Sequence, residues 1–191
     1  MTGIITRKSI FGTLAVLGLA LGVAGAAAQE RPDQLYIDMR AAVLGLEPGA
    51  VGRPRNESEG PVLLVLMELA VAKGSVMIYA FNDGTTSLYT SKGHAVIGFG
   101  TKESVREASS KFLAAAQLLH GKAEKVTEFP APRPYHVAFY LKTFDGARGY
   151  VALGDDLANN KDEMSPLFHA GYAVMMELFE VEEQLKNKKQ K

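Results

Sequence analysis

The 191-residue sequence contains no cysteine. This absence excludes disulfide bonds and a lipid-modified cysteine as a membrane anchor. An excess of one charge is lacking too, because 21 Lys and Arg residues balance 21 Asp and Glu residues. A strongly basic surface is therefore not expected, and nucleic acid is not an expected partner. The one basic cluster is the tail of Lys186, Lys188, Lys189 and Lys191, which we interpret as a solvated helix end.

Acidic side chains are missing from the first 28 residues. Two basic residues near the start precede an apolar run from Ile10 to Ala27, and small residues then lead into the polar Gln29. This order is typical of a signal peptide, so we predict cleavage between Ala28 and Gln29 and export to the periplasm or the medium. The alternative is an uncleaved membrane anchor, because about 18 apolar residues is near the lower limit for spanning a bilayer. A membrane is an expected partner only in that case.

Removal of this leader leaves roughly 160 residues, which is enough for one domain with a hydrophobic core and too few for two. We divide the chain into a signal peptide (1–28), an N-terminal helix and loop (29–61), one α+β domain (62–185) and a basic tail (186–191). The loop of the second segment is rich in Pro, Gly and charge and shows no periodicity.

Apolar residues at helical spacing predict three helices. The first begins at Pro32 and Asp33 and turns inward a stripe of Leu35, Met39, Ala42 and Leu46. The second is capped by Thr101, ends near Gly121 and buries Val105, Ala108, Phe112, Ala115 and Leu119. The third starts with Ser165 as cap and Pro166 in its first turn, and buries Leu167, Gly171, Val174, Leu178 and Leu185.

Six segments have the composition of strands: 62–71, 75–81, 85–90, 94–99, 135–143 and 148–153. Asp83-Gly84 and Asp145-Gly146 each separate two of them, and Asp-Gly can adopt the positive φ angles of a tight hairpin turn. Residues 122–134 contain three prolines and are expected to be an extended connection across the surface.

The resulting order is α-β-β-β-β-α-β-β-α. It predicts an α+β fold in which an antiparallel sheet of about five or six strands is covered by helices. The order resembles that of roadblock and profilin-like domains, which also place a helix between two groups of antiparallel strands and a helix at the end. This is a likeness of fold, and it implies no function.

Four short segments carry a second resemblance: Asp83 to Tyr89 (DGTTSLY), the turn at 97–100, the turn at 144–146, and Ser165 to Gly171 (SPLFHAG). Together they are similar to a family of small uncharacterised bacterial proteins, over roughly residues 62 to 180. The chain departs from that family by having Phe99 in place of a run of glycines and by its leader. The resemblance implies a single domain and no particular chemistry.

One candidate site is the turn formed by Gly98 and Gly100, which lies between a predicted strand and a predicted helix. Free backbone N–H groups at a helix start favour anions. A dinucleotide fingerprint would need a third glycine where Glu103 stands, so a plain turn is the favoured interpretation and no cofactor is expected.

A second candidate centres on His169, which lies four residues after Ser165. Asp145 and Asp155 are carboxylates that could approach them from the hairpin, as a Ser, His and Asp set for nucleophilic catalysis requires. No G-x-S-x-G motif positions a serine, and none of the four histidines has the spacing of a metal ligand. A histidine hydrogen-bonded at a helix start is the favoured interpretation.

We therefore expect an exported, non-enzymatic domain that binds a protein or a small ligand. The alternatives are a hydrolase-like enzyme that uses His169 with a distant carboxylate, and a membrane-anchored envelope protein.

Overall fold

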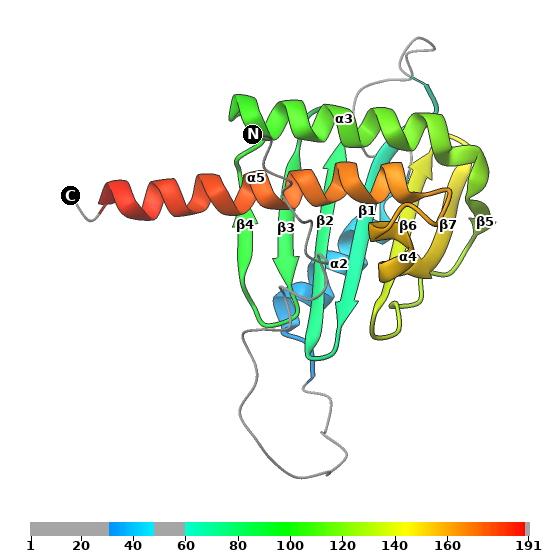
Figure 1. Cartoon of the computed structure of the whole chain (residues 1–191), viewed down its shortest axis with the longest axis horizontal. Helices are drawn as coiled ribbons and strands as arrows, with labels where there is room; N and C mark the ends of the chain where they lie inside the picture. The colour runs from blue at the N-terminus through cyan, green and yellow to red at the C-terminus, as the bar shows by residue number, and fades with distance from the viewer. Residues whose placement is uncertain (1–30, 48–59, 190–191) are drawn as a thin grey trace, which may run out of the picture.

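Strand β1 (Val62–Val71) is buried at nine of its ten positions. The computed structural model, which describes residues 31–47 and 60–189, places β1 at the centre of a seven-stranded antiparallel sheet (Figure 1). The strand order is β4-β3-β2-β1-β6-β7-β5. This confirms the predicted α+β class and antiparallel sheet, although the sheet has one strand more than the upper estimate.

The remaining strands are β2 (Gly74–Phe81), β3 (Thr86–Thr90), β4 (Ala95–Ile97), β5 (Glu124–Val126), β6 (His136–Thr143) and β7 (Gly146–Leu153). The helices of the described residues are α2 (Gln34–Gly45), α3 (Glu103–Leu119), α4 (Gly154–Ala158) and α5 (Ser165–Lys189), with a single 3₁₀ turn, η3 (His120–Lys122).

Helices cover both faces of the sheet. Helices α3 and α5 lie side by side on one face, and α2 crosses the other (Figure 1). Along β1, Val65 and Met67 belong to the core beneath α3 and α5, whereas Leu64 and Leu66 belong to the core beneath α2. Burial on both faces explains why β1 is a nearly continuous apolar run and not an alternating one.

Both predicted hairpins are present. Gly84 has φ +92° in the β2–β3 turn, where the amide of Thr85 donates to the Asp83 carboxylate at 2.8 Å. Gly146 has φ +118° in the β6–β7 turn. Positive φ angles of this kind strain any residue with a Cβ, so glycine at these two positions fixes where the strands reverse.

Two predicted helix caps are wrong. Helix α3 begins at Glu103, and the residue before it, Lys102, forms no capping hydrogen bond, so Thr101 is not the cap. Ser165 is the first residue of α5 and its hydroxyl has no hydrogen-bond partner. The Asp162 carboxylate instead accepts from the amide of Met164 at 2.7 Å and organises the turn that leads into α5.

Two short elements were not predicted. Strand β5 lies within 122–134, which was expected to be an extended connection, and α4 follows β7 directly. A three-residue strand has too few side chains for a detectable period. It exists because Glu124–Val126 pairs with β7, which is a long-range contact.

The predicted inward stripe of α2 is also wrong in part. Leu35 and Ala42 are exposed, while Tyr36, Val43 and Leu44 are buried. The helix is oriented by polar contacts, which cannot be recognised from the spacing of apolar residues in the sequence. Tyr36 and Arg40 both reach a carboxylate on the sheet.

That carboxylate belongs to Glu68 in β1, and it is 1% exposed. The Tyr36 hydroxyl donates to Glu68 Oε1 at 2.5 Å, and Arg40 Nη2 lies 2.8 Å from Glu68 Oε2. Arg40 also donates to the carbonyl of Phe129 at 2.9 Å, and Tyr140 donates to the next carbonyl, that of Pro130. One buried charge pair therefore holds α2 on the sheet and ties the proline-rich connection to it.

None of the described helices is long and apolar enough to cross a bilayer. The predicted signal peptide, the Ala28–Gln29 cleavage site and the alternative anchor lie outside the described residues.

Replacing Arg40 by Met should lower the free energy of unfolding by about 3 kcal/mol, because it leaves the buried Glu68 carboxylate without its counter-charge. Urea unfolding followed by circular dichroism measures this loss. Arg106→Met, at an exposed arginine of α3, is the matched control and should change little. Equal effects of the two substitutions would contradict the assigned role of Arg40.

Alkaline pH should destabilise the fold. Burial, followed by the neighbouring Glu68, raises the pKa of Tyr36, and burial, followed by Asp162, raises the pKa of Tyr150 to about 12. Because the protonated tyrosines are favoured in the folded state, their contribution to stability is complete below pH 10. The contribution of Tyr150 is lost as the pH rises towards 12, and that of Tyr36 declines over the same interval without being lost. Unfolding free energies measured across this interval should fall, and Tyr150→Phe should fall less steeply. Parallel curves for the two proteins would rule out the Tyr150 contribution.

Candidate functional site

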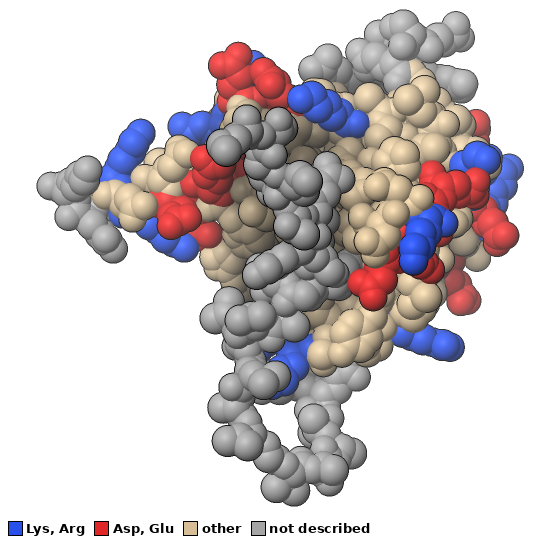
Figure 2. All heavy atoms as spheres, in the orientation of Figure 1, with Lys and Arg blue, Asp and Glu red and all other residues tan. Residues whose placement is uncertain are grey.

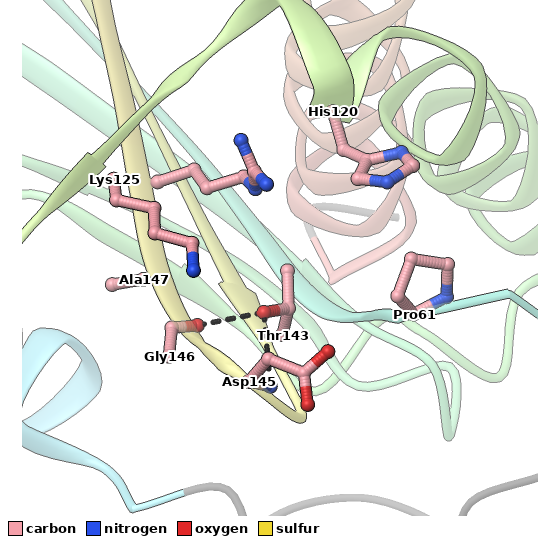
Figure 3. A pocket seen from close by; sticks show the side chains of 8 residues that line it. Pro61, His120, Lys125, Thr143, Asp145, Gly146 and Ala147 are labelled. Atoms are coloured by element: carbon pink, nitrogen blue, oxygen red, sulfur yellow. Dashed lines mark hydrogen bonds between the residues drawn. The ribbon is translucent and has the colours of Figure 1, made fainter.

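A small hollow opens at the end of the sheet where α3 stops and the β6–β7 hairpin turns (Figure 3). Its volume is about 100 Å³, which suits a small ion. Pockets for drug-sized ligands start at about 300 Å³. The hollow is lined by Pro61, His120, Lys125, Thr143, Asp145, Gly146, Ala147 and Arg148.

Gln117, near the end of α3, fixes the upper side of the hollow. Its side-chain amide accepts from the Val62 amide and donates to the Val62 carbonyl, both at 2.9 Å, so it clamps the start of β1. Its backbone carbonyl lies 2.7 Å from Nδ1 of His120. The same residue therefore sets the position of the central strand and the orientation of the imidazole ring.

The β6–β7 turn forms the lower side. The Thr143 hydroxyl donates to the Gly146 carbonyl at 2.9 Å and accepts from the Asp145 amide at 3.2 Å. Thr143 is buried, so its hydroxyl holds the turn and has little capacity left for a ligand.

Two permanent positive charges lie opposite each other on the paired strands β5 and β7. The register of β5 on β7 places Lys125 directly opposite Arg148. Like charges at directly opposite positions of an antiparallel pair repel. Neither residue forms an ion pair with any described residue, and the Arg148 guanidinium donates to the Ala123 carbonyl at 2.8 Å. The remaining N–H groups of both side chains are left for solvent or a ligand.

Asp145 is the acidic residue of the hollow. In Figure 3 its carboxylate points to the side of Pro61, away from the amine of Lys125. On the face seen in Figure 2, basic and acidic side chains are intermixed.

Metal chemistry has no visible support within the described ranges, where no three His, Asp or Glu residues are grouped so that they could hold an ion. The hollow itself offers one carboxylate and one imidazole, together with two cations that would repel a metal.

The structure separates the residues of the second sequence candidate. His169 Nε2 bonds to Asn160 Oδ1 at 3.1 Å, and the hydroxyl of Ser165, which is buried at the start of α5, has no hydrogen-bond partner. Asp145 lies in the hollow, which neither of them lines. Among the described residues, no carboxylate is hydrogen-bonded to His169.

Gly98 and Gly100 serve the backbone path into α3. Gly98 has φ +85°, and a Cβ on Gly100 would collide with the carbonyl oxygen of Gly84. Glycine at these positions allows the chain to pass close to the β2–β3 turn. A Gly-x-Gly pattern in the sequence fits this structural role as well as it fits an anion site.

Of the residues in the hollow, sequence reasoning singled out only Asp145. Lys125 and Arg148 lie 23 positions apart, and their proximity depends on the unpredicted strand β5. The available signal was the Asp145-Gly146 turn, which places Arg148 at the start of β7.

Comparisons with protein-family models, curated proteins and solved structures find no match to this chain. The resemblances to the small bacterial family and to roadblock and profilin-like domains therefore stay predictions.

Lys125→Met should raise the free energy of unfolding by roughly 0.5 kcal/mol at low salt, because it removes the repulsion across the β5–β7 pair. Salt screens such repulsion, so the gain should shrink at high chloride concentration. Lys73→Met, at an exposed lysine with no described ion pair, is the control. If Lys125→Met destabilises the protein at low salt, the two charges do not repel as described.

Proposed function

We propose that this protein is an exported, non-enzymatic binding domain that holds the oxyanion group of a small ligand or partner in the hollow. The observation that carries the proposal is the Lys125–Arg148 pair, in which two like charges are held opposite each other and no acid among residues 31–47 and 60–189 is paired to either. An anion between them would turn this repulsion into two charge-assisted hydrogen bonds.

The scaffold around the pair supports this proposal. Lys125 and Arg148 come from paired strands, and the Arg148 guanidinium is held by its bond to Ala123, which is buried. A charged donor that is already ordered loses less entropy when it binds a ligand. The size of the hollow favours one oxyanion group, with the remainder of a larger ligand lying outside it.

Binding without chemistry is supported by the arrangement of the reactive side chains. Catalysis by a nucleophile needs the nucleophile and its base within hydrogen-bond reach of each other. The described contacts of Ser165, His169 and Asp145 do not include one another. Export is supported by the acid-free apolar leader of the sequence.

Inorganic sulfate should bind at the hollow and shift the backbone amide resonances of residues 143–148 in ¹H–¹⁵N NMR spectra, with chloride used to hold the ionic strength constant. Lys125→Met and Arg148→Met should each weaken binding at least about tenfold, because each removes a charged donor. Lys73→Met and Arg133→Met, at exposed basic residues away from the hollow, are the matched controls. Equal weakening by all four substitutions, or sulfate-induced shifts spread over the whole surface, would refute a specific site.

A further inference from the structure

The hydrogen bond of the His120 ring defines which of its two nitrogens carries a proton. Nδ1 lies 2.7 Å from the backbone carbonyl of Gln117, and a carbonyl oxygen can only accept a hydrogen bond. Nδ1 therefore carries a hydrogen in every protonation state of the folded protein. Only Nε2 is free to gain or lose a proton, and no described residue is hydrogen-bonded to it.

The state of Nε2 decides whether His120 attracts or repels an anion. In the neutral ring Nε2 presents a lone pair, which repels an oxyanion oxygen. In the charged ring it presents an N–H donor. Figure 3 shows the ring on the opposite side of the hollow from Lys125, so a protonated His120 would add a third positive charge to the lining of the hollow.

The charges around the ring complete the argument. Lys125 on β5 and Arg148 on β7 give two positive charges, and Asp145 in the turn gives one negative charge. Lys122, the other charged residue of η3, is paired with Glu163 at 2.9 Å. The hollow thus has one net positive charge when His120 is neutral and two when it is protonated, which matches a dianion.

From this geometry we infer that the hollow takes up a tetrahedral dianion, either sulfate or a phosphate monoester, together with one proton that moves from water to Nε2 of His120. This inference rests on the proposed function, and it adds the charge class of the ligand and its dependence on pH. Binding of sulfate, which remains a dianion, strengthens as the pH falls, since protonation of His120 supplies both the missing charge and the missing donor.

Sulfate is the appropriate probe because it remains a dianion across the range in which histidine titrates. We expect its dissociation constant, measured by NMR titration on the full mature chain, to be about tenfold lower at pH 5.5 than at pH 8. At pH 7, adding sulfate should increase the protonated fraction of His120, followed by the chemical shift of its Cε1 proton. Nitrate, a monoanion, should show a much smaller change with pH.

Two histidine substitutions isolate the effect. His120→Gln should still bind sulfate at pH 8 through Lys125 and Arg148 but should lose the tenfold gain at pH 5.5. His136→Gln is the matched control, because His136 also directs Nδ1 to a backbone carbonyl, that of Pro134, and lies outside the hollow. It should keep the full dependence on pH.

The phosphate monoester can come from two sources. Glycerol 3-phosphate presents it free, and phosphatidylcholine vesicles that contain phosphatidic acid present it on a membrane. Binding of either one that depends on Lys125 supports the dianion class, and binding of neither contradicts it.

The outcomes separate the two proposals. Sulfate binding that requires Lys125 and Arg148 but is equal at both pH values, or a gain at pH 5.5 that survives in His120→Gln, would overturn the proton-coupled inference and leave the anion site in place. Absence of sulfate binding at both pH values would overturn the anion site as well.

Discussion

Burial of β1 on both faces is the constraint from which the rest of the arrangement follows. A strand that is apolar on both sides must lie inside the sheet, so β2 and β6 flank it, α3 and α5 cover one face and α2 covers the other. The first residue of β1, Val62, is hydrogen-bonded through its amide and its carbonyl to the side chain of Gln117. The hollow therefore lies next to the start of the central strand. Gln117, which holds that strand, also holds the His120 ring at the upper side of the hollow.

Two arginines of the structure differ in whether an acid is paired to them. Arg40 is neutralised by the buried Glu68, and that pair attaches α2 and the proline-rich connection to the sheet. Arg148 lies opposite Lys125, and among the described residues its guanidinium is bonded to the Ala123 carbonyl and to no acid. A buried pair of this kind organises a fold, since either charge alone in the interior costs several kcal/mol. The repulsion between Lys125 and Arg148 does not stabilise the fold, and the proposed binding of an anion would give this pair a role.

Local chemistry made much of the fold predictable. The apolar run of β1, the two Asp-Gly turns and the stripes of α3 and α5 are properties of neighbouring residues, and all appear where expected. The orientation of α2 was not predictable in this way, because the polar residues Tyr36 and Arg40 face inward only in the presence of Glu68. Most residues of the hollow could not be predicted from the sequence for a related reason. The hollow depends on the register of the short strand β5, and therefore on contacts distant in sequence. Whether the leader is cleaved remains a prediction from the sequence.

An anion between Lys125 and Arg148 is the central claim, and anomalous diffraction from crystals soaked in selenate tests it most directly. Selenate has the shape and charge of sulfate, and the anomalous signal of its selenium locates the ion directly. The account predicts a selenium peak within hydrogen-bonding reach of Lys125, Arg148 and Nε2 of His120 in crystals held at mildly acidic pH. A hollow without selenium while the ion occupies other basic surfaces would contradict it.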